Sequence, residues 1–414
     1  MTANRSSFGN KRGIALPLTL GILFILGLLI NSFYWIVSAE RHEVARRFER
    51  TKSQFSVLSA LEYAFFQTRQ QEEPWRASDL HYASLDSSVV FSLNSEQEGA
   101  FGLLKVTTPF QRDSAVFRVG YLPGNLPALT LLDPNATVAL AGDASITGNV
   151  AMRNPQINLS YHYKMPASAL AEFWGDTIGE TAPIWDSIAV FPEPSRKFFE
   201  SMQTYPDKDC IFDARDTLNG DYFCRNFLMQ GDSYCNGCRV FSESMEIRGR
   251  AFFKNGFAVA HLITVSEESQ ISGHIMARDT LNVVLEEPQT GEMVYAVLGR
   301  KTGPVEYAGL MNVEKFRGKA LILYLGDEWD SSLPGISAIL GDKTEIEGFV
   351  FIHGSLDLKG KVRGSVAASH FAFEDSGILW LGYLKDGQIV SDTGVSFLVP
   401  DGFRMGGELS YEYR

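Results

Sequence analysis

The chain has 414 residues, which allows one large domain or two to three modest ones. Hydrophobic residues make up 45% of it and charged residues 21%, a composition that excludes a mostly disordered chain. The net charge of −12, with no block rich in Lys and Arg, argues against a nucleic-acid-binding protein.

The first predicted element is a membrane helix over residues 14–37, which carry no formal charge. At about 1.5 Å per residue this helix would span about 36 Å, enough for a hydrocarbon core of about 30 Å. The apolar part of a signal peptide is only about 7–15 residues long, so we expect the segment to be retained as an anchor. The anchor side chains include Leu18, Leu20, Phe24, Leu28 and Trp35.

The junction before this segment reads Lys11-Arg12-Gly13-Ile14-Ala15-Leu16. A short basic leader that ends in Gly and runs into a long apolar helix resembles the amino terminus of a type IV prepilin. The resemblance covers roughly residues 11–70. It implies that a prepilin peptidase cuts between Gly13 and Ile14 and methylates the new terminus, while leader residues 1–13 stay cytoplasmic. The positive-inside rule alone does not give this orientation, because more Lys and Arg follow the segment than precede it.

One position departs from the common pilin pattern. Leu18 is the fifth residue after the cut, where most pilins have a Glu that pairs with the cationic terminus of a neighbouring subunit. A start of this kind without the Glu resembles X-type minor pilins and the K-type minor pseudopilins of type II secretion. The K-type subunits sit at the fibre tip and have an enlarged head.

The helix is expected to continue beyond the membrane as an amphipathic stem, over residues 14–72 in all, with Pro74 ending it. Apolar residues recur in this part at helical spacing between charged ones, at Val44, Phe48, Phe55, Leu58, Leu61 and Phe65. This layout is that of a pilin stem. The alternative is an ordinary juxtamembrane helix of a signal-anchored protein.

A small antiparallel sheet is predicted next, over residues 73–125. Three strand-like runs, 88–93, 102–107 and 115–122, are separated by polar turns. A helix followed by such a sheet is the layout of a pilin head, although a generic α+β module has it as well.

The remaining sequence contains long stretches of alternation. Between residues 346 and 368 every even position is apolar or Gly, which predicts β structure with one buried face. A single strand of this length would measure about 76 Å at about 3.3 Å per residue, against about 17–20 Å for a typical strand. Gly348, Gly354 and Gly360 are suited to bends, so we expect the chain to turn repeatedly with the same face inside.

The same pattern recurs over residues 136–155 and 239–375, which resemble the Gly-punctuated turns of right-handed β-helix and bactofilin-like solenoids. The expected fold class is therefore α+β, mainly β, with a β-solenoid-like domain over residues 126–377. Turn number and handedness stay open, and a β-sandwich is the alternative fold. Residues 156–238 are interpreted as an insertion, helical at 166–174 and 194–202. Residues 378–414 are interpreted as a β cap with a hairpin turn at Lys385-Asp386-Gly387.

The four cysteines, Cys210, Cys224, Cys235 and Cys238, all fall in the predicted insertion. An even number, close spacing and an exported location favour two disulfides, whose connectivity stays open. Zinc is the alternative, but a structural Cys₄ site usually has two Cys-x-x-Cys pairs and only Cys235 and Cys238 form one.

No enzyme class is indicated. The sequence has no Gly-x-Ser-x-Gly elbow, phosphate loop or dinucleotide fingerprint, and its seven histidines show no metal-ligand spacing. We therefore expect no catalytic residues, no metal and no cofactor. After Arg69 there are 45 acidic and 28 basic residues, so the exported part carries about −17.

These patterns predict a minor pilin or pseudopilin with a single-pass anchor in the inner membrane and an extracytoplasmic head for tip assembly or adhesion. Its expected partners are the membrane, other pilin subunits and the prepilin peptidase, with surface polysaccharide as a candidate ligand and no nucleic acid. Two alternatives are a plain envelope scaffold and a membrane-anchored carbohydrate-binding or carbohydrate-cleaving β-helix. The last would use charged residues of one outward face, Asp357, Lys359, Lys361 and Arg363. The acidic residues Glu345 and Glu347 are interpreted as a solvated face rather than a calcium or sugar site.

Overall fold

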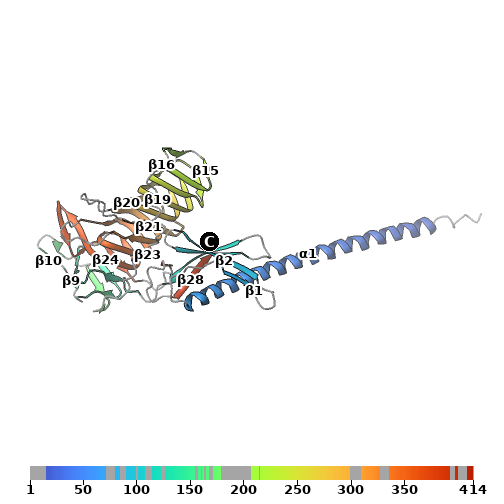
Figure 1. Cartoon of the computed structure of the whole chain (residues 1–414), viewed down its shortest axis with the longest axis horizontal. Helices are drawn as coiled ribbons and strands as arrows, with labels where there is room; N and C mark the ends of the chain where they lie inside the picture. Colours follow the sequence, from blue (N-terminus) through green and yellow to red (C-terminus); the bar gives the residue numbers. More distant parts are fainter. Residues whose placement is uncertain are drawn as a thin grey trace, which may run out of the picture. The chain divides into compact units, whose positions relative to one another are not determined.

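The structure is a computed structural model. It describes residues 15–70, 80–83, 90–98, 101–107, 114–122, 126–153, 157–159, 161–162, 165–166, 171–178, 207–213, 215–298, 309–326, 335–391, 397–399 and 408–413. In this part of the chain one long helix is followed by strands, so the protein is mainly β (Figure 1). The chain divides into two compact units, residues 1–94 with 105–115 and residues 95–104 with 116–414.

The helix α1 (Ala15–Gln70) has 56 residues and continues without a break from the apolar segment into the charged one. At about 1.5 Å per residue it is about 84 Å long. Pro17 is tolerated because it lies in the first turn, where its missing N–H has no partner within the helix. Pro74, which the sequence predicts to end the stem, lies outside the described residues.

A five-stranded sheet has the strand order β1-β2-β3-β4-β28, with β1 antiparallel to β2 and β28 antiparallel to β4. The bounds are Leu80–Ala83 for β1, Val90–Glu98 for β2, Phe101–Thr107 for β3, Ser114–Leu122 for β4 and Glu408–Tyr413 for β28. The three predicted strands are present as β2 to β4. The fifth comes from the carboxyl terminus, so the chain between Leu122 and Glu408 is inserted between two hydrogen-bonded strands of one sheet.

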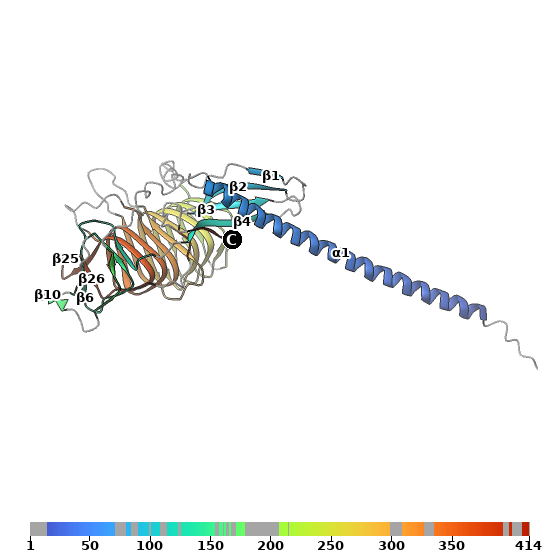
Figure 2. The same cartoon turned by 90° about the horizontal axis from the view of Figure 1, so that it is seen from below.

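Most of the other described strands form one large, mainly parallel sheet, whose strands lie side by side in Figure 2. In its long central part the strands are β14 (Cys210–Phe212), β15 (Thr217–Leu218), β16 (Asp221–Met229), β17 (Tyr234–Asn236), β18 (Arg239–Ile247), β19 (Phe252–Glu267), β20 (Gln270–Leu285), β21 (Met293–Val297), β22 (Leu310–Tyr324), β23 (Ala338–Leu358) and β24 (Lys361–Asp375). Asp221 pairs with Arg239 and Arg239 with Phe257, a constant step of 18 residues.

Strands from the beginning of the large sheet's sequence lie next to those from its end. They are β5 (Leu129–Leu131), β7 (Ser145–Thr147), β8 (Val150–Ala151), β12 (Glu172–Trp174) and β13 (Thr177–Ile178). In space β24 pairs with β5 and with β27 (Gln388–Val390), and β27 then pairs with β7. The first strand of the large sheet, β5, and its last parallel strand, β27, therefore both pair with β24.

The remaining strands lie at one end of the large sheet, where Figure 2 labels β6, β10, β25 and β26. The strand β26 (Tyr383–Lys385) is parallel to β6 (Val138–Ala141), which pairs with β9 (Ile157–Leu159). The strand β25 (Ile378–Leu381) is antiparallel to β24, and β10 (Tyr161–His162) is antiparallel to β11 (Met165–Pro166).

Two clusters of buried side chains hold the large sheet. The interior cluster contains the predicted even positions of the 346–368 pattern, Ile346, Val350, Ile352, Leu356, Leu358, Val362, Val366 and Ala368, which confirms the alternation. A second cluster, which we call the outer apolar face, lies on the other side of the same strands and contains Phe241, Val259, Met276, Leu323 and Phe351. Phe101, Leu398 and Val399 belong to this outer cluster. One stretch of the sheet is therefore buried on both faces, as parallel sheets commonly are.

Close stacking explains two of the glycines in the pattern. Gly348 pairs with Gly364 in the register of β23 and β24, and a Cβ on Gly364 would lie 2.0 Å from the carbonyl oxygen of Gly348. Any side chain there would collide with backbone.

Several predictions for this region were wrong. Residues 172–174 form the strand β12 rather than helix, because Phe173 pairs with Ile146 and packs against the interior cluster. Residues 207–238 do not interrupt the sheet as an insertion but supply β14 to β17, in parallel register with β16 to β19. The predicted helix at 194–202 lies outside the described residues.

The carboxyl-terminal predictions also need correction. Residues 378–390 are not a terminal cap, since β27 lies between β24 and β7. The turn at Asp386 and Gly387 is present, with Asp386 at a φ of 64°, but it does not close a hairpin. The strands on its two sides pair with different neighbours, β26 with β6 and β27 with β24.

Candidate functional site

The amino-terminal half of α1 is an exposed apolar rod. Of the described residues, only this helix is long and apolar enough to cross a membrane, and none of the side chains in its most apolar stretch is buried. The predicted anchor residues Leu18, Leu20, Phe24, Leu28 and Trp35 are all more than half exposed. Fully burying one side chain of this kind is worth about 1.5–3 kcal/mol, so the segment is suited to lipid or a protein partner rather than water. The predicted cut between Gly13 and Ile14 lies outside the described residues.

The charged half of α1 has two distinct faces. Ser56 and Ala60 are buried, whereas Val44, Phe48, Phe55 and Leu58 are exposed. Along this half, Arg47 forms an ion pair with Glu43 one turn earlier, and the hydroxyl groups of Thr51 and Ser56 donate to carbonyl oxygens four residues before them. The exposed apolar side chains Val44, Phe48, Phe55 and Leu58, which we call the stem stripe, therefore lie on a helix that also has polar contacts between its own turns.

The four cysteines form two disulfides, Cys210–Cys224 and Cys235–Cys238, and no described cysteine is free. Cys210 lies on β14 and Cys224 on β16, two adjacent strands. All four side chains are buried in the interior cluster, so the cysteines contribute to the core. The predicted disulfides are present and the zinc alternative is not.

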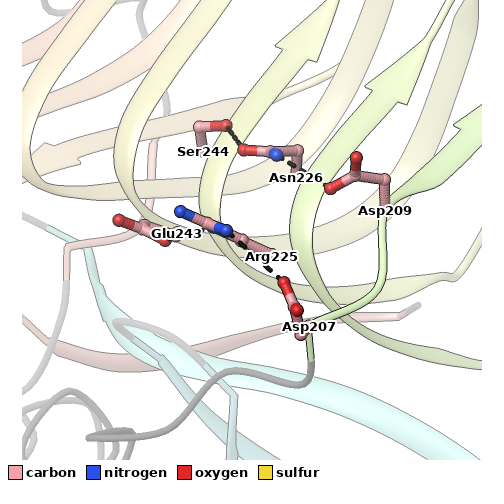
Figure 3. Close-up of polar contacts among 6 residues, drawn as sticks. All are labelled: Asp207, Asp209, Arg225, Asn226, Glu243 and Ser244. Carbon is pink, nitrogen blue, oxygen red and sulfur yellow. Dashed lines mark hydrogen bonds and ion pairs between the residues drawn. The ribbon is translucent and has the colours of Figure 1, made fainter.

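Polar side chains on or next to neighbouring strands pair at separations of 17 or 18 residues (Figure 3). Asn226 donates to Asp209 at 2.8 Å and accepts from the hydroxyl of Ser244 at 2.7 Å. Arg225 lies 3.4 Å from Asp207 on one side and 3.4 Å from Glu243 on the other. We call these contacts the polar ladder. They hold neighbouring strands in register and are exposed, so each ion pair contributes little to stability by itself.

The polar ladder extends to further pairs with the same spacing. Arg239 lies 3.9 Å from Asp221, Arg250 lies 3.0 Å from Asp232, and His261 lies 3.0 Å from Asp279. The ladder was not predicted from the sequence, because the separation between its partners is set by the strand register. The signal in the sequence is an opposite charge or a polar partner 17 or 18 residues away.

Burial shifts the pKa of a histidine and of an aspartate in the large sheet. His370 Nε2 lies 2.9 Å from Asp133 Oδ2, and burial lowers the pKa of His370 against the opposing effect of Asp133. Burial raises the pKa of Asp357, although its hydrogen bond with Lys359 at 3.0 Å acts the other way. Within the described ranges, no group of three or more His, Cys, Asp or Glu is placed to hold a metal ion.

The four charged residues proposed for a carbohydrate groove do not all lie on one outward face. Asp357 is buried rather than outward, and it pairs with Lys359. Lys361 and Arg363 lie on β24, in register with Glu345 and Glu347 on β23. The two glutamates therefore alternate with cations on neighbouring strands.

Comparisons of the chain with protein-family models, with curated proteins and with solved structures found no match.

Proposed function

We propose that this protein is a minor pilin-like or pseudopilin-like subunit of a type IV pilus or type II secretion fibre. The carrying observation is α1, a single 56-residue helix whose apolar half is exposed and whose charged half keeps an exposed stem stripe. A plain membrane anchor needs only about 20 residues. Such an anchor accounts neither for the continuous extension of the helix nor for Phe48 and Phe55 beyond the apolar segment.

The order of the modules supports the proposal. The Gly13-Ile14 junction immediately precedes the helix, and the five-stranded sheet follows it. The large sheet is inserted between β4 and β28, so the strands that would form the pilin-like head stay together. In this proposal the helix and small sheet assemble into the fibre. The inserted part is the enlarged head, held in the extracytoplasmic space where disulfides persist.

The proposal includes a finer architecture for the head, a β-solenoid of right-handed turns. Its support is the 18-residue register step and the interior cluster formed by the same face of consecutive strands. Within β19, Phe252 to Lys254 pair with β17 and Phe257 to Val265 pair with β18, so consecutive parts of one strand stack on consecutive parts of the preceding turn.

Processing tests the assignment in cells. The Gly13→Glu variant is expected to keep its 13-residue leader and to be absent from sheared fibres, because the peptidase needs the small residue at the cut. Gly9→Glu is the matched control, since it places the same charge in the leader outside the junction, and it should be processed normally. Equal processing of the two variants, or normal display in cells without prepilin peptidase, would contradict the proposal and leave a plain scaffold.

A further inference from the structure

Six charged residues form a regular array on three neighbouring strands of the large sheet. In register, Arg317 on β22 lies beside Glu345 on β23, which lies beside Lys361 on β24. Lys319, Glu347 and Arg363 form the parallel row two residues further along. Between the rows, Ile346 and Val362 are buried in the interior cluster, so the array lies on the opposite, solvent side. We call these six residues the charged face.

The charged face differs from the polar ladder in how its charges are used. Arg225, Arg239 and Arg250 of the ladder each pair with an acid 18 residues earlier in the chain. None of the six side chains of the charged face makes an ion pair or a side-chain hydrogen bond with any residue that the structure describes. Holding strands in register therefore explains the ladder and does not explain the charged face.

The array has an excess of cations on an acidic protein. It contains four cations and two carboxylates, on a chain whose net charge is −12. Cations two residues apart on one strand are about 7 Å apart, and those of β22 and β24 are separated by two strand spacings, about 10 Å. A repeating two-dimensional array of this kind is complementary to a polymer with anionic groups at regular intervals, rather than to a single small ion.

An exposed tryptophan lies further along the same row. From Arg363 the register passes through Val390 on β27 and Thr147 on β7 to Trp174 on β12. Trp174 is 64% exposed, and its indole N–H donates to Glu172 at 2.8 Å. Tryptophan is usually largely buried, and an exposed indole offers a flat apolar surface with a fixed orientation. The C–H face of a sugar ring stacks on such a surface.

We propose that the charged face and Trp174 bind an acidic polysaccharide laid across the strands from β22 to β12. The sugar carboxylates accept hydrogen bonds from Arg317, Lys319, Lys361 and Arg363, and a sugar ring covers Trp174. A nucleic acid carries a denser negative charge than an acidic polysaccharide, so the net charge of the chain repels it more strongly. This inference rests on the large sheet alone, so it stands or fails independently of pilin-like assembly.

Binding of the full chain in detergent to polygalacturonate, measured by calorimetry at low and moderate salt, tests the proposal. The unmodified chain should bind polygalacturonate, bind more weakly as salt increases, and not bind neutral dextran. Lys361→Gln with Arg363→Gln should weaken binding about tenfold, equivalent to about 1.4 kcal/mol. Trp174→Ala should weaken it with little change in salt dependence, because its contribution is apolar.

Matched variants separate this surface from general charge effects. Arg225→Gln with Arg239→Gln removes two cations from the polar ladder and should leave affinity within about twofold, equivalent to about 0.4 kcal/mol. Lys361→Arg should preserve binding. The proposal would be overturned by an equal loss of affinity in the ladder variant or by unchanged affinity in the Lys361→Gln, Arg363→Gln variant. Binding to dextran, or tighter binding to duplex DNA than to polygalacturonate, would also overturn it.

Discussion

Phe55 and Ala60 lie on different faces of α1: Phe55 is 65% exposed, and Ala60 is completely buried. Five residues turn a helix through about 140°, so the two side chains point nearly apart. The helix thus buries small residues and leaves large apolar ones exposed, at positions where a surface helix normally has polar side chains. We therefore predict that a partner covers the stem stripe.

The stem stripe is expected to be needed for assembly and not for folding. Phe48→Ser with Phe55→Ser removes two side chains whose full burial is worth about 1.5–3 kcal/mol each. We expect thermal unfolding of the head to be unchanged and the amount of protein in sheared fibres to fall. Gln54→Ser, an exposed polar position on the same helix, is the control and should assemble normally. A drop in unfolding temperature without loss of assembly would show that the stripe is structural.

Removing the Cys210–Cys224 disulfide should loosen one end of the large sheet. The bridge closes a loop of about 15 residues and is worth about 3 kcal/mol. Among the described strands, β14 has a single parallel partner, β16, so few other contacts replace the bridge. In Cys210→Ser with Cys224→Ser, amide hydrogen exchange should accelerate over residues 207–218 and stay slow over 361–373. Uniform acceleration, or none, would contradict a local role.

Tyr295→Phe should stabilise the large sheet. Tyr295 is fully buried against Phe316, and its hydroxyl has no hydrogen-bond partner among the described residues. Burial also raises the pKa of this hydroxyl, which therefore stays protonated. An unsatisfied buried polar group costs about 1–3 kcal/mol, so its removal should raise the free energy of unfolding by about 1 kcal/mol in urea titrations. A destabilised variant would mean that the hydroxyl has a partner, such as a buried water.

His370 should make the sheet sensitive to mild acid. Because burial lowers its pKa below 6.5, the unfolded chain binds protons more readily than the folded one. The stability linked to this group is present above pH 6.5 and is lost as the pH falls through the lower folded pKa. His370→Gln should flatten the dependence of unfolding free energy on pH between about 7 and 5. His42→Gln, on the exposed part of α1, should leave the slope unchanged.

Asp357 should affect the pH dependence of stability in the opposite direction to His370. Burial raises its pKa above 3.8, so the folded state binds the proton more readily, and the associated stability is lost as the pH rises. Asp357→Asn should therefore be more stable than the unmodified chain at pH 7, with the difference shrinking as the pH falls toward 4. Asp342→Asn, at an exposed position of β23, is the control and should show no such trend. A less stable variant at pH 7 would mean that the Lys359 pair outweighs desolvation.

Periodicity predicted the local structure well. The apolar segment and the helical spacing of Val44 and Phe48 predicted a continuous helix, and even-position alternation predicted the interior cluster from Ile346 to Ala368. Both predictions depend on residues close in sequence, because the period of a helix or a strand decides which of their side chains share a face.

Long-range pairing could not be predicted in the same way. Nothing near Gln388 indicates that it pairs with Ser145, and nothing near Glu408 indicates that it pairs with Leu122. The helical reading of 166–174 failed because pairing of Phe173 with Ile146 outweighed local preference. The polar ladder was missed for the same reason, since Asp207 and Arg225 become neighbours only through the register.

The mass of the amino-terminal peptide of the protein isolated from native membranes is the most direct test of pilin-like processing. Cleavage after Gly13 predicts a peptide that begins with N-methylated Ile14, and the same peptide with residues 1–13 attached when prepilin peptidase is deleted. A peptide that begins at Met1 or Thr2 in cells with active peptidase would contradict the pilin-like function and leave a protein tethered by an ordinary anchor.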